Sequence, residues 1–284
     1  MNDKTFVSWE AAVSWLMNQP DKQQLVRDCY YDPSVQQAAE RYYNSPEWQA
    51  ISRYVPDSKG FAMDLGAGRG IASYALARDG WQVAALEPDS SDLVGAGAIK
   101  TLALENNLPI SVSQEFGERI NFDANTFELV FARQVLHHAN DLEQLCTELF
   151  RVLKPGGSLI AVRDHVISSK KDLAAFFDVH PLHSLYGGEN AYTSHEYLVA
   201  LKKAGFKVKR VLRSFDSVIN FAPYTEASLK AEMQQRIIKI PVFGKLSRIF
   251  NIDFLYRSLL RCLSFVDRRP GRLYSFVCFK PEEQ

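Results

Sequence analysis

An acidic residue and three glycines lie close together at the end of an apolar segment of this 284-residue chain. Asp64 closes the apolar run, and Gly66, Gly68 and Gly70 follow at alternate positions before residues 71–78, which favour a helix. A strand that ends in a glycine turn and continues as a helix brings backbone N–H groups close to a ligand. Glycine suits this turn because it reaches positive φ and has no Cβ to hold the ligand away. The pattern therefore predicts a site for a dinucleotide, a phosphate or an adenosine-containing molecule.

The spacing of the glycines favours one class of ligand. A dinucleotide turn has the pattern G-x-G-x-x-G, which would place the third glycine at position 71, where the chain has Ile71. The third glycine is instead Gly70, and the carboxylate of Asp64 stands where it could receive an amino group. Charge and spacing therefore suit a cationic amino-acid ligand better than a pyrophosphate. Glu87 ends the next expected strand and could accept both hydroxyls of a ribose, although dehydrogenases use a carboxylate in the same way.

The segments that must position these residues alternate between strand-like and helix-like patterns, which predicts βαβ units and a parallel sheet. Ligands of such sheets bind beyond the carboxyl ends of the strands. The expected strands are 60–64, 82–87, 110–113, 127–132, 158–163, 206–215 and 272–279. The expected helices are 69–79, 90–106, 141–153 and 194–204. Residues 164–193 are expected to form a polar loop region.

Two helical additions flank this sheet in the sequence. Residues 1–58 are expected to be an N-terminal helical extension, in which Ser45 caps a helix that starts at Pro46. Residues 59–284 are expected to be one domain that carries a helical insertion at 222–268. In that insertion, apolar residues recur at helical spacing with Lys and Arg between them, which fits either a lid over an active site or a basic helix at a membrane surface.

Three later segments, together with the glycine turn, carry a resemblance to a known family. Residues 125–131, 134–138 and 148–160 have the patterns N-T-F-E-L-V-F, Q-V-L-H-H and E-L-F-R-V-L-K-P-G-G-S-L-I. In this order the four motifs resemble those of the class I S-adenosylmethionine (SAM) methyltransferases of the type 11-like group. The resemblance implies a Rossmann-like α/β fold, in which a seven-stranded, mostly parallel sheet with an antiparallel last strand has helices on both faces.

The resemblance also implies which residues bind the cofactor, SAM. They are Asp64, Gly66, Ala67, Gly68, Glu87, Pro88, Phe116, Arg133 and Gln134. One segment departs from the family pattern, because residues 114–118 lack the usual G-D-A-E and place Phe116 where the family has an adenine-binding aspartate. Either Glu115 takes that role in a shifted register, or Phe116 stacks on the adenine.

Methyl transfer to a hydroxyl needs a group that removes the proton, and an imidazole suits this because its pKa is near neutrality. We expect His165 to be this base, followed in preference by His183 and His180, with Asp164 orienting a histidine. His137 and His138 are expected to have structural roles. The same loop histidines and Asp164 could also hold a metal, but their spacing gives this little support, and we expect no metal site.

Composition limits the class of protein. The chain has four scattered cysteines without a C-x-x-C pair, no apolar leader and no apolar run long enough to span a membrane. We therefore expect a cytoplasmic enzyme with reduced thiols. The net charge is zero, but residues 202–272 carry 16 Lys and Arg against 5 Asp and Glu, which indicates either a solvated helical face or a surface for an anionic partner.

These observations predict a SAM-dependent methyltransferase that acts, at oxygen, on a small or medium-sized acceptor that is hydrophobic or lipid-linked. We expect no nucleic acid and no obligate protein partner, and a peripheral membrane contact stays open. The alternatives are an RNA or protein methyltransferase that uses the basic C-terminal third, a non-catalytic SAM-binding protein and a nicotinamide dehydrogenase.

Overall fold

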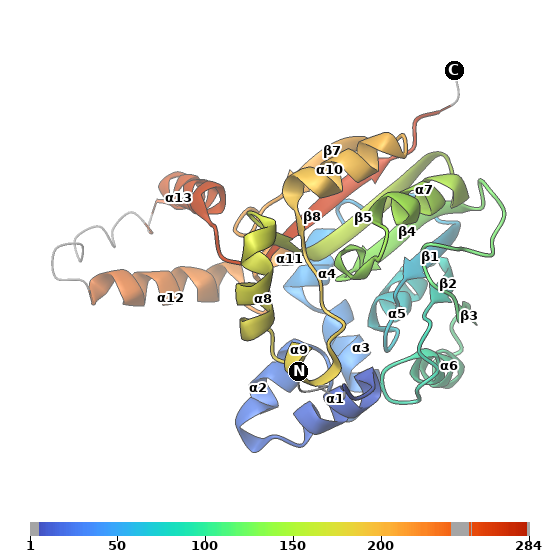
Figure 1. Cartoon of the computed structure of the whole chain (residues 1–284), viewed down its shortest axis with the longest axis horizontal. Coiled ribbons are helices and arrows are strands. Elements are labelled where there is room, and N and C mark those ends of the chain that lie inside the picture. The colour runs from blue at the N-terminus through green and yellow to red at the C-terminus, as the bar shows by residue number, and fades with distance from the viewer. Residues whose placement is uncertain (1–5, 240–249, 251, 283–284) are drawn as a thin grey trace.

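A central sheet with helices on both faces forms the body of the protein in the computed structural model (Figure 1), which describes residues 6–239, 250 and 252–282. The strands follow the order β3-β2-β1-β4-β5-β8-β7, and the short strand β6 pairs with the end of β5. Their bounds are β1 Phe61–Leu65, β2 Gln82–Leu86, β3 Ile110–Ser113, β4 Phe127–Arg133, β5 Leu153–Ile167, β6 Tyr192–Thr193, β7 Lys207–Leu212 and β8 Arg272–Phe279.

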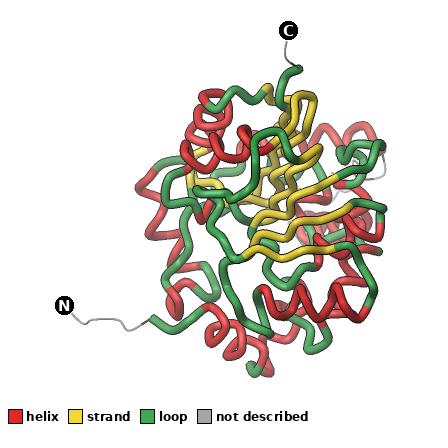
Figure 2. The backbone as a smooth tube through the Cα atoms, turned by 90° about the vertical axis from the view of Figure 1, so that its right-hand side faces the viewer, coloured by secondary structure: helices red, strands yellow, loops and turns green. Residues whose placement is uncertain are grey.

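The pairing of the strands confirms the predicted Rossmann-like α/β fold. Strands β1 to β5 pair in parallel, whereas β8 runs antiparallel to both β5 and β7. The strands lie side by side between layers of helix (Figure 2). Among the described residues the sheet has eight strands rather than seven, because the two residues of β6 add to the end of β5, a pairing too short to leave a pattern in the sequence.

The helices surround the sheet and continue beyond it. The longer ones are α1 Trp9–Met17, α3 Val35–Tyr43, α5 Ile71–Arg78, α6 Ala96–Glu105, α7 Leu142–Val152, α10 Ser194–Lys203, α12 Glu226–Ile238 and α13 Asp253–Val266. The shorter ones are α2 Gln23–Asp28, α4 Pro46–Ile51, α8 Leu173–Val179, α9 His183–Tyr186 and α11 Val218–Phe221. None of the helices in the described ranges is long and apolar enough to cross a bilayer.

Alternation along the strands supplies a core on each face of the sheet. Ala62, Leu129 and Phe131 face the core that α3, α4 and α5 complete, whereas Met63 and Val130 face the core of α7 and α10. Successive side chains of a strand point to opposite faces, so each apolar strand contributes to both layers. The parallel strands therefore lie between two apolar cores, one on each face of the sheet.

Local side-chain hydrogen bonds explain where several helices begin and where strand β7 ends. Ser45 accepts a hydrogen bond from Trp48 N, as expected for the cap of α4. Helix α6 starts at Ala96, later than the predicted residue 90, because Ser91 and Asp89 form side-chain turns before it. Strand β7 ends at Leu212, before the predicted residue 215, where Asp216 accepts a hydrogen bond from Arg213 N.

The expectation of a polar loop at 164–193 was wrong. Strand β5 continues to Ile167, and helices α8 and α9 follow it. The buried side chains Phe176 and Leu182 explain these helices, because they join apolar clusters with Ile167 and with Val13 of α1. Segment 181–186 therefore packs against the N-terminal helices, at the same edge of the sheet as the glycine turn.

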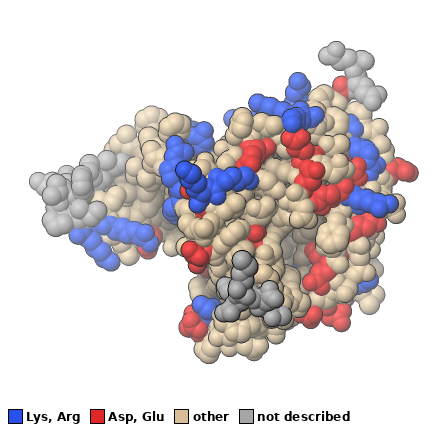
Figure 3. All heavy atoms as spheres, in the orientation of Figure 1, with Lys and Arg blue, Asp and Glu red and all other residues tan. Residues whose placement is uncertain are grey.

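The insertion expected at 222–268 contains α12 and α13, which project from the body (Figure 1). Residues 240–249 and 251 of that insertion lie outside the described residues. Lys and Arg side chains gather along α12 and the adjoining face (Figure 3). On α13, Phe254 and Phe265 are exposed, whereas Tyr256 and Leu260 pack against Phe221 of α11.

Candidate functional site

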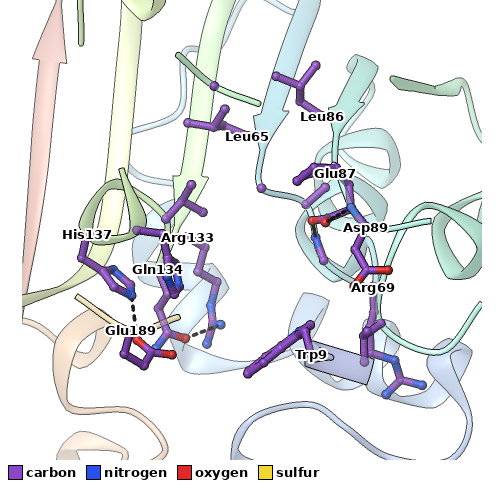
Figure 4. A pocket seen from close by; sticks show the side chains of 18 of the residues that line it. Trp9, Leu65, Arg69, Leu86, Glu87, Asp89, Arg133, Gln134, His137 and Glu189 are labelled. Carbon is purple, nitrogen blue, oxygen red and sulfur yellow. Dashed lines mark hydrogen bonds and ion pairs between the residues drawn. The ribbon is translucent and has the colours of Figure 1, made fainter. Parts of the chain in front are cut away.

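A cavity of about 730 Å³ lies beyond the carboxyl ends of β1, β2 and β4. The glycine turn and the end of β2 form one wall, and the N-terminal helices and residues 180–189 form the others (Figure 4). The predicted site residues that line it are Asp64, Gly66, Ala67, Gly68, Glu87, Pro88, Phe116, Arg133, Gln134, His165 and His180. One cavity therefore gathers eleven of the twelve predicted site residues; the exception is His183.

The glycine turn has the backbone that its sequence predicts. Gly66, Gly68 and Gly70 have φ of 58°, 54° and 81°, in the left-handed region that glycine tolerates best. A Cβ on Gly66 would lie 2.7 Å from a methyl of Val135. A side chain at Gly66 would therefore collide with the segment that follows β4, and the positive φ angles favour glycine at all three positions.

Asp64 lies at the end of β1 with 1% of its surface exposed, and its Oδ2 accepts a 2.6 Å hydrogen bond from the Ser73 hydroxyl. Burial raises the pKa of Asp64 to about 7, although the hydrogen bonds from Ser73 oppose this shift. Burial therefore favours the protonated carboxyl more than it would for an exposed aspartate. A cationic group bound nearby would favour its charged form.

Glu87 joins the end of β2 to the glycine turn. Its Oε2 accepts from Gly68 N at 2.7 Å and its Oε1 accepts from Asp89 N at 3.0 Å. These backbone donors fix both carboxylate oxygens at the cavity wall (Figure 4). Each oxygen keeps a lone pair for a further donor, so the pair can receive vicinal hydroxyls.

Arg133 lies at the end of β4 but has a partner that sequence reasoning missed. Its Nε and Nη2 donate to the two carboxylate oxygens of Glu47 on α4, at 2.8 and 3.2 Å. Burial disfavours a charged Glu47, but Arg133 and Arg163 outweigh that cost and hold its pKa below the ordinary value. The Arg133 guanidinium therefore ties α4 to the site, while its Nη1 donates to Gln134 Oε1 at 2.9 Å.

The segment after β3 places both residues predicted to contact the adenine, Glu115 and Phe116, at the cavity wall. Phe116 lines the cavity and is 69% exposed, so its ring is open to a ligand. Glu115 lines the cavity as well, but its Oε2 already accepts from Asn121 N at 2.8 Å. The Glu115 carboxylate keeps further acceptor sites, so both predicted adenine contacts stay predictions.

The three histidines expected to act as bases occupy different environments. His165 and His180 line the cavity, whereas His183 stacks on Phe177 at a centroid distance of 4.0 Å and is not part of the cavity wall. Burial and the nearby charge of His137 lower the pKa of His165 to about 3. His165 therefore holds a proton too weakly to be an effective general base by itself.

His137 and Glu189 are the site residues that sequence reasoning missed. His137 Nδ1 lies 3.0 Å from Asp164 Oδ1, so the histidine that Asp164 orients is His137. On the other side of the ring, His137 Nε2 lies 3.6 Å from Glu189 Oε2 (Figure 4). Burial opposes charge on His137, but the adjacent Asp164 and Glu189 carboxylates outweigh it and raise its pKa to about 9.

This histidine–carboxylate cluster consists of His137, His165, His180 and Glu189, all of which line the cavity. His180 Nε2 lies 3.5 Å from Glu189 Oε1, and the Tyr186 hydroxyl donates to the same oxygen. The pair of histidines at 137 and 138 could have indicated this cluster from the sequence. No sequence pattern marks Glu189, because only the fold brings residues 180–189 close to the segment that follows β4.

Comparison with known proteins agrees with this geometry. A family model described as a methyltransferase domain matches residues 63–161. The chain contains a class I SAM-dependent methyltransferase domain. The rat mitochondrial ubiquinone biosynthesis O-methyltransferase is 32% identical over 99 residues, which cover 34% of this chain and 28% of that protein. The sterol 24-C-methyltransferase of Saccharomyces cerevisiae is 33% identical over 113 residues, which cover 39% and 28% of the two chains.

A solved structure of Haemonchus contortus phosphoethanolamine N-methyltransferase 2 with phosphomonomethylethanolamine and S-adenosylhomocysteine is similar in fold, with a TM-score of 0.59 and 19% identity. The match covers 97% of this chain and 61% of that one. The chain spans about half or less of the length of the curated relatives that it matches first. Together with the open turn and the anchored Glu87 carboxylate, the comparisons make SAM the cofactor of this domain.

Proposed function

We propose that the protein transfers a methyl group from SAM to a hydroxyl oxygen of a small or medium-sized hydrophobic acceptor. The observation that carries the proposal is the continuity of one cavity between the glycine turn and the histidine–carboxylate cluster. A cofactor site at one end and groups that bind a hydroxyl and remove its proton at the other are the two needs of O-methylation.

At the cofactor end, SAM supplies an electrophilic methyl group on a sulfonium. The Glu87 carboxylate accepts the ribose hydroxyls, and Asp64 faces the amino group directly or through water. Gly66, Ala67 and Gly68 present backbone to the cofactor, Phe116 and Pro88 flank the adenine, and Arg133 and Gln134 shape the wall next to the amino-acid part. The burial of Asp64 and the fixed orientation of the Glu87 carboxylate support this placement of the cofactor.

At the acceptor end, apolar side chains from the N-terminal helices and from residues 181–186 share the wall with the cluster. They are Trp9, Leu16, Leu25, Tyr31, Leu182 and Tyr186. Relatives named for ubiquinone biosynthesis and for sterol methylation are consistent with a hydrophobic acceptor. We propose that these side chains hold its apolar part and that the hydroxyl points toward His137 and Glu189.

The proton of the acceptor leaves at this cluster. We retain His165 and His180 as members of it and replace His183 by His137, which Asp164 orients. In this proposal residues 1–58 are an extension that covers the cavity of the domain at 59–284. The described residues of the insertion at 222–268 do not line the cavity, so we do not assign the predicted lid role to them. The four free cysteines support a reducing compartment such as the cytoplasm.

A peripheral membrane contact is a second proposal for α13. Its exposed Phe254 and Phe265 flank the exposed Arg257 and Arg261 along the helix, and this combination favours an anionic lipid surface. Such a contact would deliver a lipid-linked acceptor to the cavity.

Turnover tests the main proposal. Purified protein with SAM and a panel of hydroxylated aromatic and isoprenoid compounds should release S-adenosylhomocysteine with at least one of them. With the matched O-methylated compounds, in which the hydroxyl is already blocked, the protein should release no S-adenosylhomocysteine. Turnover on amines or on RNA, and none on the hydroxylated panel, would contradict the proposal.

A further inference from the structure

Three side chains of the cluster offer metal-ligating atoms at one point of the cavity. The ligand atoms of His137, His165 and Glu189 all lie within 4.8 Å of one another. His137 comes from the 3-10 helix Leu136–His138 that follows β4, His165 from the end of β5, and Glu189 from the segment after α9. His137 and Glu189 are 1% and 7% exposed, so these ligating groups lie at the inner wall of the cavity and away from bulk solvent.

Each histidine is already oriented by a second partner. His137 Nδ1 faces Asp164 Oδ1 at 3.0 Å, and His165 Nδ1 faces the carbonyl oxygen of Gly271 at 2.8 Å. A metal-bound histidine in proteins usually donates its other ring N–H to a carboxylate or a backbone carbonyl, which fixes the tautomer. An ion that displaced the Nε2 proton of His137 would leave both rings in the Nδ1–H form, with Nε2 as the ligand atom.

Glu189 supplies the third group. Its Oε2 lies 3.6 Å from His137 Nε2, too far for a good hydrogen bond. Two ligands about 2.1 Å from a tetrahedral Zn²⁺ are about 3.4 Å apart, close to this separation. Within the described residues Oε2 is also buried without a hydrogen-bond partner, and a buried carboxylate oxygen without a partner is costly.

The charges of the site agree with a bound cation. Asp164 and Glu189 are both buried, and the ion pairs that the described part of the chain gives them are with His137 and His180. The two buried carboxylates therefore have imidazole partners, which can lose their protons, rather than a permanent Lys or Arg charge. A divalent ion bound in place of the His137 Nε2 proton would keep a positive charge beside both carboxylates.

We propose that His137, His165 and Glu189 hold one divalent transition-metal ion, for which Zn²⁺ is the best match, with an open coordination position toward the cavity. Two histidines and one glutamate are a ligand set of open zinc sites. The sequence alone led us to expect no metal, because His137 and Glu189 lie 52 positions apart and their proximity follows only from the fold.

The open position would take the oxygen of the acceptor, an inference that rests on the proposed function. A metal ion lowers the pKa of a bound hydroxyl and orients it, and the released proton passes to solvent. The substrate class is therefore a hydroxylated acceptor whose oxygen binds the metal while its apolar part contacts the N-terminal helices.

Metal titration of the purified full chain tests this proposal without any acceptor. Protein stripped with a chelator should bind one equivalent of Co²⁺, with the intense visible absorption of a four- or five-coordinate site, and Zn²⁺ should displace the Co²⁺ and remove the absorption. Glu189→Gln and His165→Ala should each weaken binding more than tenfold, and Asp164→Asn should weaken it about 10- to 100-fold.

The surface histidine of α10 provides the control. His195 is exposed, so His195→Ala should bind Co²⁺ as the parent protein does. Circular dichroism identifies any variant that fails to fold. The proposal is overturned if the parent binds no stoichiometric Co²⁺ or Zn²⁺, or if both folded variants, E189Q and H165A, bind metal as the parent does. Turnover on the hydroxylated panel separates the two proposals, because release of S-adenosylhomocysteine by a protein that binds no stoichiometric metal would overturn the metal site and leave the proposed function standing.

Discussion

The two ends of the cavity are built in different ways. At the cofactor end, Asp64, Gly66 and Gly68 lie within five residues of one another, and Glu87 is fixed by their backbone. At the acceptor end, His137, Asp164 and Glu189 come from segments that are far apart in the chain. A local backbone turn is specified by local sequence, whereas a cluster of side chains depends on how distant elements pack. Mutations should therefore separate cofactor binding from turnover.

The largest effect is expected for Glu189→Gln at the acceptor end. Loss of the carboxylate charge next to His137 and His180 should lower kcat at least 100-fold, since a group positioned for proton removal contributes about 10²–10⁴ to rate. The Kd for SAM should change less than twofold. Single-turnover kinetics and calorimetry measure the two quantities on the same preparation. A parallel loss of SAM affinity would show that the two ends are not separable.

Glu87→Ala should show the opposite pattern. The ribose hydroxyls would lose a charged acceptor worth about 1.5–3 kcal/mol, which corresponds to a Kd for SAM about 10- to 150-fold weaker. The value of kcat at saturating SAM should change much less. Calorimetric titration of SAM checks the first statement and initial rates check the second. Unchanged affinity would mean that the end of β2 does not contact the ribose.

Asp64 gives a pH dependence to the cofactor end. Its folded-state pKa of about 7 lies above the ordinary value near 3.9, so the carboxyl carries a proton below pH 7 and loses it above. The positively charged amino group of SAM favours the ionised form, so SAM affinity should rise by up to tenfold per pH unit as pH increases toward 7 and then level off.

Calorimetry between pH 5.5 and 8.5, in buffers with different ionisation enthalpies, should detect the released proton. The matched variant Asp64→Asn keeps the size of the side chain and should lose this dependence. A pH profile shared by the parent and the variant would assign the titration to another group.

The smallest effect is expected for His183→Ala. His183 stacks on Phe177 and is not part of the cavity wall, so kcat should stay within about twofold of the parent value. His165→Ala, measured beside it, should lower turnover strongly. Equal losses in the two variants would restore His183 as a catalytic candidate.

Much of the fold and of the cofactor end could be predicted from the sequence. The strand at 272–279 has the predicted bounds, and the pattern of the glycine turn corresponds to three positive φ angles. These features follow from short-range rules, in which apolar runs form strands and glycines permit left-handed backbone. Family motifs added the order of the segments and the antiparallel last strand.

The acceptor end could not be predicted, for identifiable physical reasons. The pairing of β5 with β8 shifts register between Ala161 and Asp164, and Arg163 has φ of 62°. Such an irregularity breaks the alternation of a strand, so the direction of Asp164 toward His137 had no signature in the pattern. Glu189 is placed by the packing of Leu182 against Val13 and Leu16 of α1, a contact between segments about 170 positions apart.

A crystal structure with S-adenosylhomocysteine bound tests the central claim most directly. The account predicts that both ribose hydroxyls donate to Glu87, that the amino group lies near Asp64, and that the sulfur faces His137 and Glu189 across open volume large enough for an acceptor. A sulfur that faces away from the histidine–carboxylate cluster, or an adenosine bound outside the glycine turn, would contradict it.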